Sequence, residues 1–188
     1  MIENEFKIML TEQQYSEIHA LFDWEREAEQ VNSYYDSPDL QLSDRHITCR
    51  VRSVSGKYLL QMKLPAGELN NGAVSRIEVE QELDRLPQKL SGSELTALSG
   101  ADDLPEVQLL GTLSTLRSVK HFPGAEIDLD KSWYFGKIDY ELEIEYTDEA
   151  AAKSLLAEIT TRVELDRSVP VTGKIRRFLA EYLRDLSS

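Results

Sequence analysis

Several stretches of the sequence place charged side chains at every second position. Glu141, Glu143 and Glu145 alternate with apolar residues, and Arg50 and Arg52 flank a valine. Alternate side chains of an extended strand point to the same face of a sheet, so the charged groups of each stretch share one face. A solvated strand also alternates, but the polar positions here are dominated by charged groups of both signs. Because opposed like charges destabilise a sheet unless cations lie between them, the pattern indicates bound ligands.

The charged residues belong to two chemical classes that suit one kind of ligand. Arg and Lys bind phosphate oxygens, Arg as a planar fork and Lys as a point charge. Carboxylates bind Mg²⁺ or Mn²⁺, which prefer oxygen ligands and commonly bridge phosphates to protein. Both halves of a metal–polyphosphate site are therefore present. The charged strand positions are Glu3, Glu5, Lys7, Arg50, Arg52, Lys63, Arg76, Glu78, Glu80, Arg117, Asp128, Asp130, Glu141 and Glu143, with Glu82, Asp139 and Glu145 at strand ends, where a solvated surface is an equally good explanation.

The overall charge argues against a nucleic-acid partner. The chain has 34 acidic and 21 basic residues and a formal net charge of −13. Nonspecific nucleic-acid binding usually needs the opposite balance, because basic groups displace counterions from phosphate. The single cysteine, Cys49, fits a reducing compartment and is expected in the core. With no apolar run typical of a signal peptide or a membrane span, the expected location is cytoplasmic, with no membrane partner.

The periodicity of apolar residues predicts about eight strands and three main helices. Strands are expected at 2–8, 30–36, 45–54, 58–64, 75–83, 109–119, 125–134 and 137–147. Helices are expected after the N-cap residues Thr11, Asp148 and Thr172, ending near Trp24, Val163 and Leu186. A short helix is an option within 84–107.

These elements predict an α+β fold built mainly from antiparallel strands. If about eight such strands close into a barrel, one face of every strand lines a common interior. With the apolar faces turned outward against the helices, that interior becomes a polar tunnel. We therefore expect an eight-stranded antiparallel β-barrel with flanking helices, in a single domain spanning residues 1–188, since neither a repeat nor a linker divides the chain.

The N-terminal Glu3-x-Glu5-x-Lys7 resembles the signature of the CYTH superfamily, also called triphosphate tunnel metalloenzymes. The resemblance continues in order along essentially the whole chain, and it is nearest to the small stand-alone bacterial members of the Gram-positive type. The further matching positions are Tyr34-Tyr35-Asp36, Arg50-Val51-Arg52, Lys63, Arg76-x-Glu78-x-Glu80, Arg117, Asp130, Glu141-x-Glu143-x-Glu145, Lys174 and Arg177.

The resemblance implies an eight-stranded tunnel that binds a triphosphate end-on and needs a divalent metal, Mg²⁺ or Mn²⁺. The implied metal ligands are Glu3, Glu5, Asp130, Glu141 and Glu143. The implied substrate-binding residues are Lys7, Arg50, Arg52, Lys63, Arg76, Arg117 and the gating Lys174. The candidates for a catalytic role are Glu5, Lys63, Glu78 and Glu80, of which Glu78 and Glu80 would support the basic residues or a second metal.

One position departs from the family pattern. Many members carry a basic residue two positions before the arginine aligned with Arg117, whereas this chain has Thr115. One phosphate contact is therefore expected to be missing. His19, His46 and His121 are scattered over a predicted helix, a strand edge and a loop, and they are expected to be surface or packing residues.

Three functions are compatible with these residues and remain open. The first is a metal-dependent triphosphatase acting on inorganic tripolyphosphate, thiamine triphosphate or a nucleoside triphosphate. The second is an adenylyl cyclase of the CYTH type, which needs a base-recognition pocket that no sequence feature secures. The third is a non-catalytic sensor of polyphosphate or nucleotide. A homodimer is also expected to be an option, because sheet surface is exposed.

Overall fold

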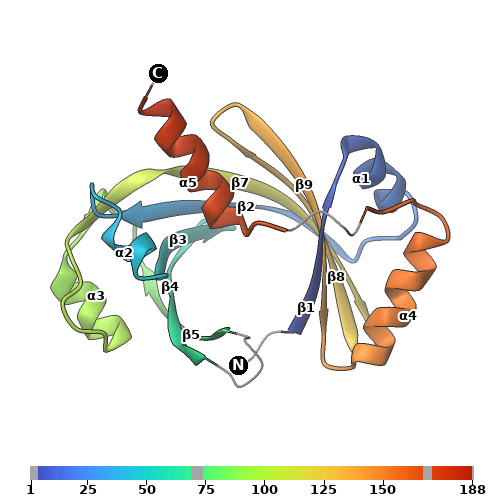
Figure 1. The fold of residues 1–188 in the computed structure, drawn as a ribbon, viewed down its shortest axis with the longest axis horizontal. Helices are drawn as coiled ribbons and strands as arrows, with labels where there is room; N and C mark the ends of the chain where they lie inside the picture. Colours follow the sequence, from blue (N-terminus) through green and yellow to red (C-terminus); the bar gives the residue numbers. More distant parts are fainter. Residues whose placement is uncertain (1–3, 69–73, 167–170, 188) are drawn as a thin grey trace. The chain divides into compact units, whose positions relative to one another are not determined.

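The computed structural model describes residues 4–68, 74–166 and 171–187, without the side chains of 66–68 and 74–76 (Figure 1). The strands are β1 (Asn4–Leu10), β2 (Arg26–Asp36), β3 (Thr48–Val54), β4 (Lys57–Glu68), β5 (Val74–Leu83), β6 (Lys89–Leu90), β7 (Val107–Phe122), β8 (Ala125–Tyr134) and β9 (Lys137–Tyr146). The helices are α1 (Glu12–His19), α2 (Gln41–Asp44), α3 (Gly92–Ser99), α4 (Glu149–Thr160) and α5 (Lys174–Asp185).

The strands form one sheet in the order β1-β9-β8-β7-β2-β3-β4-β5, and β6 pairs with β7. Antiparallel registers join β1, β9, β8 and β7 in one series and β2, β3, β4 and β5 in another. By its contacts the chain divides into two compact units. Of the described residues, unit 1 contains those within 30–113 and 182–187, and unit 2 contains those within 4–29 and 114–181.

Unit 2 has one apolar sheet face, which α1 and α4 cover. Its core contains Ile8 of β1, Leu129 of β8 and Ile144 of β9, packed with Ile18 of α1 and Ile159 of α4. These side chains are at most 5% exposed. Since alternate residues of a strand face opposite ways, burial of this face turns the intervening charged residues to the other face.

Unit 1 repeats the design with different helices. Cys49 and Val51 of β3 and Met62 of β4 pack with Leu42 of α2 and Leu95 of α3. The intervening residues of β3, including Arg50 and Arg52, are turned to the opposite face. The prediction that Cys49 is a core residue is confirmed, because its side chain is only 2% exposed.

Local sequence signals set the ends of several elements. Ser55 and Gly56 both have positive φ, 53° and 78°, and join β3 to β4 in a two-residue turn that suits the strand twist. Thr11 makes the predicted capping box with Gln14 at the start of α1. The predicted cap of α4 is also confirmed, since the Asp148 carboxylate accepts hydrogen bonds from the Ala150 and Ala151 backbone N–H groups.

The predicted α+β class and the antiparallel sheet are confirmed, and the short helix within 84–107 is α3. The order of the sheet ends at β1 and β5, and no pairing joins these two strands within the described ranges. The four-residue helix α2 and the two-residue strand β6 were not predicted, because elements this short carry no measurable periodicity. None of the helices in the described part of the chain has the length and apolarity needed to span a bilayer.

Some predicted boundaries are wrong. Helix α1 ends at His19 and not near Trp24, whose indole instead donates to the His19 carbonyl oxygen at 2.9 Å. Helix α5 begins at Lys174, so the residue before it is Gly173 and not the predicted cap Thr172. His121 lies within β7 and not in a loop. The predicted metal ligand Glu3 and the side chain of Arg76 lie outside the described residues.

The cap of α4 gives a stability prediction. Replacing Asp148 with alanine leaves two backbone N–H groups of the first helical turn without their acceptor, so the free energy of unfolding should fall by about 1 kcal/mol. Urea denaturation measures this change. The control Glu158→Ala, on the exposed side of the same helix, should stay within about 0.5 kcal/mol of the parent. Equal effects of the two substitutions would contradict the capping role.

Candidate active site

The charged side chains of unit 2 form rows across its four strands. The registers pair Lys7 with Glu143 and Glu143 with Asp128. Paired residues of antiparallel strands point to the same face, so these side chains are neighbours. We call this surface the carboxylate face, defined by Glu5, Lys7, Arg117, Asp128, Asp130, Asp139, Glu141, Glu143 and Glu145.

Glu143 is the centre of the carboxylate face. Its Oε1 atom lies 3.2 Å from Lys7 Nζ and 2.6 Å from Lys174 Nζ. Its Oε2 atom accepts a hydrogen bond from Arg117 Nη2 at 2.9 Å. The Glu143 side chain is only 6% exposed, so these cations compensate a buried charge whose burial alone is unfavourable.

Arg117 binds the carboxylates of two neighbouring strands. Its Nε and Nη2 atoms donate to the two oxygens of Asp130 at 2.8 and 2.6 Å, which is a bidentate pair. Its Nη1 atom donates to Asp128, and Nη2 also reaches Glu143. Arg117, which the sequence predicts to bind substrate, is thus paired with carboxylates of the protein and holds them close to one another.

Helix α5 adds two cations to the carboxylate face. Lys174 Nζ lies 2.8 Å from Asp130 Oδ2 and 3.2 Å from Glu141 Oε1, besides its contact with Glu143. Arg177, one turn further along α5, contacts Asp139 and Glu141. The strong amphipathicity of α5 explains this placement, because Phe178 on the same side is fully buried.

The charges of this cluster shift one another's pKa. Burial disfavours the charged form of Glu143, but Lys174 and Arg117 outweigh it and hold the pKa of that carboxyl well below its usual value. For Glu141 burial outweighs Lys174 and Arg177, so the pKa of its carboxyl is raised. Burial also opposes the charge of Lys174, but Asp130 and Glu143 raise its pKa above the ordinary value. Glu143 therefore stays ionised at neutral pH, which is the form of a carboxyl group that can bind a metal ion.

Three carboxylates fit a divalent cation. Glu5, Glu143 and Glu145 each offer an oxygen atom, and these oxygens lie within 4.8 Å of one another. An all-oxygen set suits Mg²⁺ or Mn²⁺. Among the described residues, this is the group of three His, Cys, Asp or Glu side chains whose ligand atoms lie close enough together to hold a metal ion. Glu5 and Glu143 are predicted ligands, whereas for Glu145 the sequence favours neither surface nor site.

Asp128 has the features of a site residue, but sequence reasoning assigned it no role. Its side chain is 2% exposed, and its Oδ1 atom is a buried oxygen without a hydrogen-bond partner in the described chain. Burial raises the pKa of the Asp128 carboxyl to about 7, although Arg117 acts in the opposite direction. Its alternation with Asp130 was the available signal, but alternation does not show which carboxylates are buried.

Unit 1 carries the second charged group, which we call the basic face and define by Arg50, Arg52, Gln61, Lys63, Glu78 and Glu80. Arg50 Nε donates to Gln61 Oε1 at 3.0 Å, and Gln61 Nε2 donates to Glu80 at 3.2 Å. Arg52 Nε donates to Asn32 Oδ1 at 3.0 Å. Lys63 pairs with Glu78. Glu78 and Glu80 thus support basic groups, directly or through Gln61.

The structure therefore brings the predicted residues together in two groups, one in each unit. Thr115 is fully buried and makes a hydroxyl pair with Ser132 at 2.8 Å, so β7 and β8 carry neutral side chains at these two positions. Asp36 has a structural role, since it accepts hydrogen bonds from the backbone N–H groups of Leu42 and Ser43. Tyr35 donates to the Pro87 carbonyl oxygen and packs in the core of unit 1.

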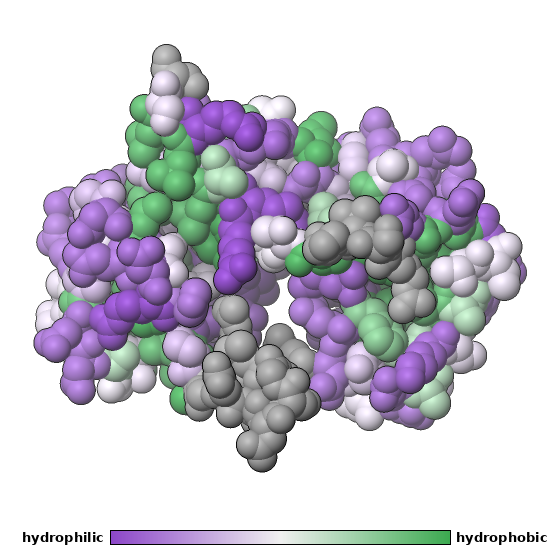
Figure 2. All heavy atoms as spheres, in the orientation of Figure 1, coloured by the Kyte–Doolittle hydropathy of each residue, from purple (hydrophilic) through white to green (hydrophobic). Residues whose placement is uncertain are grey.

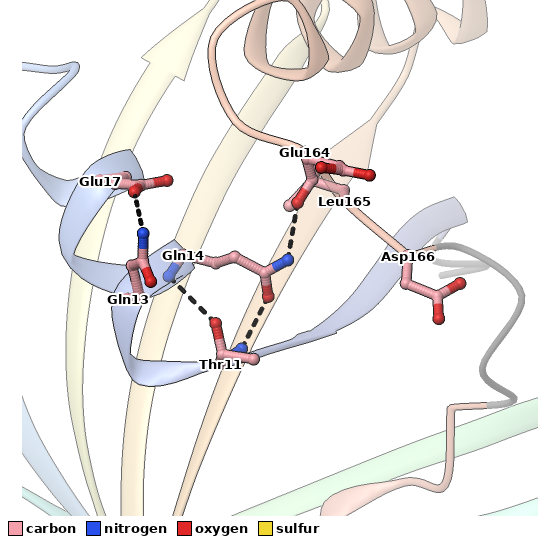
Figure 3. A pocket seen from close by; sticks show the side chains of 7 residues that line it. All are labelled: Thr11, Gln13, Gln14, Glu17, Glu164, Leu165 and Asp166. Atoms are coloured by element: carbon pink, nitrogen blue, oxygen red, sulfur yellow. Dashed lines mark hydrogen bonds between the residues drawn. The ribbon is translucent and has the colours of Figure 1, made fainter.

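A surface cavity of unit 2 contains none of these residues (Figure 3). It is lined by Thr11, Gln13, Gln14, Glu17, Glu164, Leu165 and Asp166. Gln14 crosses it, because its side-chain amide donates to the Glu164 carbonyl oxygen at 2.6 Å and accepts from the Thr11 N–H. These contacts explain the cavity as the join between α1 and the segment after α4. Elsewhere, hydrophilic residues cover much of the visible surface (Figure 2).

Comparison with known proteins identifies the family. The model of the CYTH domain matches residues 1–178. A Bacillus subtilis protein, YjbK, whose name proposes a triphosphatase, is 31% identical over 96% of this chain and 95% of its own length.

Solved structures share the fold of this chain. A Bacillus halodurans protein named as a proposed adenylate cyclase has a TM-score of 0.70 and 25% identity, covering 94% of this chain and 97% of its own. HpAC1 from Hippeastrum, described as a proposed adenylyl cyclase with a dominant triphosphatase activity, has a TM-score of 0.71 and 23% identity, covering 95% and 96% of the two chains. The expected family is confirmed: this chain belongs to the CYTH family.

Proposed function

We propose that this protein is a divalent-metal-dependent triphosphatase that hydrolyses inorganic tripolyphosphate or another triphosphate. The observation that carries the proposal is the carboxylate face, where Asp130, Glu141 and Glu143 are almost fully buried. Such a concentration of buried carboxylates beside Lys and Arg is costly for a fold and is typical of a site that binds ions. The family membership and the name of YjbK point to the same activity.

Metal binding is assigned to the carboxylates of unit 2. Glu5, Glu143 and Glu145 would hold Mg²⁺ or Mn²⁺, and Glu3, Asp130 and Glu141 are the further ligands that the family resemblance implies. When bound, the metal supplies neutralisation of phosphate charge and orientation of the attacking water. Lys7 Nζ lies 3.0 Å from Glu5 Oε1 and 3.2 Å from Glu143 Oε1, so this ammonium group can bind a phosphate oxygen beside the proposed metal ligands.

The basic face of unit 1 is assigned to the binding of phosphate oxygens. Arg50 and Arg52 project from the same face of one strand, and the Nε atom of each donates to a neutral side chain. Lys63 is held by Glu78. The substrate-binding set is Lys7, Arg50, Arg52, Lys63, Arg76, Arg117 and Lys174, of which Lys174 would act as a gate.

Catalysis then depends on positioning and electrostatics. Loss of the terminal phosphoryl group needs its charge to be neutralised by the cations and its attacking water to be oriented by a carboxylate, for which Glu5 is the candidate. A covalent cysteine intermediate is not part of the proposal, because Cys49 is buried in the core of unit 1 and its thiol pKa is raised by burial to about 12.

Two other functions use the same groups. An adenylyl cyclase would direct a ribose hydroxyl at the α-phosphate, and the name of the Bacillus halodurans relative favours testing this. A non-catalytic sensor would bind the triphosphate without turnover. A cytoplasmic location, a homodimer and the absence of nucleic-acid and membrane partners belong to the proposal as well.

A panel of triphosphates separates these functions. Purified protein with Mg²⁺ or Mn²⁺ should release orthophosphate from tripolyphosphate, thiamine triphosphate or a nucleoside triphosphate, because the site neutralises the terminal phosphate group. Chromatography of the products gives the answer. Cyclic nucleotide with pyrophosphate would establish the cyclase, and tight binding without products would establish the sensor.

Glu143 tests the metal assignment. Glu143→Gln keeps the size of the side chain but removes the charge that faces Lys7, Lys174 and Arg117, so kcat should fall by about 100-fold or more and Mn²⁺ binding should weaken. Steady-state kinetics and a Mn²⁺ titration measure the two effects, with circular dichroism to verify folding. Glu158→Gln, an exposed glutamate of α4, is the matched control. A folded Glu143→Gln protein with parental activity would remove Glu143 from the site.

Arg52 tests the phosphate assignment. Arg52→Ala removes a guanidinium from the basic face, so KM for the triphosphate should rise by about tenfold or more while kcat changes less. The exposed Arg162, in the turn that follows α4, serves as the matched control in Arg162→Ala. Initial rates over a range of substrate concentrations decide the matter, and an unchanged KM would contradict the role of Arg52.

A further inference from the structure

Arg177 of α5 binds two side chains of the carboxylate face and one backbone carbonyl group. Its Nε atom donates to Asp139 Oδ2 at 2.8 Å, and its Nη2 atom donates to Glu141 Oε2 at 2.5 Å. Its Nη1 atom donates to the backbone carbonyl oxygen of Thr172. All three nitrogens of the guanidinium are therefore engaged with different groups.

We infer that Arg177, held by Asp139, is a positioning residue that orients Glu141 and the first turn of α5 for metal and triphosphate binding. This inference rests on the proposed function and deepens it. Neither Arg177 nor Asp139 belongs to the proposed metal-binding or substrate-binding groups, which come from other positions.

The geometry of Glu141 shows what Arg177 does. The Glu141 side chain is only 1% exposed, and its two oxygens face different partners. Arg177 Nη2 donates to Oε2, whereas Oε1 lies 3.2 Å from Lys174 Nζ and 3.6 Å from Lys7 Nζ. By holding one oxygen, Arg177 sets the rotation of the carboxylate and keeps the other oxygen directed at the cluster of cations.

Arg177 also fixes the start of α5. The Thr172 carbonyl oxygen that it binds precedes the helix by two residues, and Lys174 lies three positions before Arg177 on the same side of the helix. The same guanidinium therefore restrains both Glu141 and the segment that carries Lys174. Lys174 and Glu141 contact each other directly, since Lys174 Nζ lies 3.2 Å from Glu141 Oε1.

Asp139 anchors Arg177 from the strand side. Asp139 is two residues before Glu141 in β9, so both carboxylates lie on the same face. Its Oδ2 atom receives the Arg177 Nε–H and also the Tyr134 hydroxyl, at 2.5 Å. The order of contacts, from Tyr134 through Asp139 and Arg177 to Glu141, is that of an outer partner that orients an ion ligand.

Simple docking of α5 is the competing explanation. Other contacts also hold this helix on unit 2: Lys137 Nζ lies 2.6 Å from Glu181, and the Phe178 ring lies 5.1 Å from that of Phe135. Lys137→Gln breaks a docking ion pair that touches neither Glu141 nor Lys174, and is therefore the matched control. Arg177→Lys keeps the positive charge but cannot reproduce a planar fork between two carboxylates and a carbonyl group.

The experiment compares Arg177→Lys, Asp139→Asn, the double variant and Lys137→Gln. Two readouts are used: kcat and KM with the triphosphate that the parent hydrolyses, and Mn²⁺ binding without substrate, followed by electron paramagnetic resonance. Arg177→Lys should lower kcat/KM and Mn²⁺ affinity by about 10-fold or more, the usual effect of losing an orienting partner. Asp139→Asn should act in the same direction.

The double variant should be no worse than Arg177→Lys within about twofold, because both substitutions break the same chain of contacts. Lys137→Gln should lower the thermal midpoint while leaving both readouts within about twofold of the parent. Parental values for Arg177→Lys, or independent, multiplying effects of the two single substitutions, would overturn the inference. So would losses in Lys137→Gln equal to those in Arg177→Lys, since docking alone would then explain them.

Failure of the proposed function has a different signature. In that case the parent protein itself neither hydrolyses a triphosphate nor binds Mn²⁺, and the positioning inference is overturned with it. A parent that binds Mn²⁺ without turnover still tests Arg177 through the metal titration.

Discussion

Compensation of buried carboxylates by Lys and Arg is the constraint on which unit 2 depends. Asp130, Glu141 and Glu143 are at most 5% exposed, and an uncompensated charge at such depth would destabilise the fold by several kcal/mol. Arg117 supplies the compensation from a neighbouring strand, and Lys174 supplies it from α5. The two cations differ in their attachment, because Arg117 is fixed within β7 whereas Lys174 is carried by the first turn of a helix. Buried pairs of carboxylates with Lys or Arg add little to the stability of a fold. Their presence here is therefore better explained by a role in binding ions.

The two-residue period of the strands makes this arrangement compatible with a stable core. One face of each strand packs against α1 and α4 in unit 2, or against α2 and α3 in unit 1, and the other face is left to charged groups. The two faces differ in composition: carboxylates outnumber Lys and Arg on the carboxylate face, whereas Arg50, Arg52 and Lys63 stand beside Glu78 and Glu80 on the basic face.

Much of this could be predicted from the sequence because alternation and capping are local. The strands, the caps Thr11 and Asp148 and the burial of Cys49 follow from a few neighbouring residues each. Contacts between side chains that are distant in the sequence cannot be predicted in this way. The grouping of Glu145 with Glu5 depends on the register of β1 against β9, the orphan oxygen of Asp128 depends on how Arg117 is shared, and the role of Arg177 depends on where α5 docks. The sequence shows Glu145, Asp128 and Arg177 as charged positions, but it does not show these contacts.

The carboxylate face is proposed to bind a divalent cation beside a triphosphate. The most direct test of this binding is a crystal structure of the protein grown with Mn²⁺ and tripolyphosphate, with anomalous diffraction collected to locate manganese. We expect an anomalous peak about 2.1 Å from carboxylate oxygens of Glu5 and Glu143, with phosphate oxygens completing its coordination. Manganese bound only elsewhere on the protein, with Lys174 still seated between Asp130 and Glu143, would contradict it.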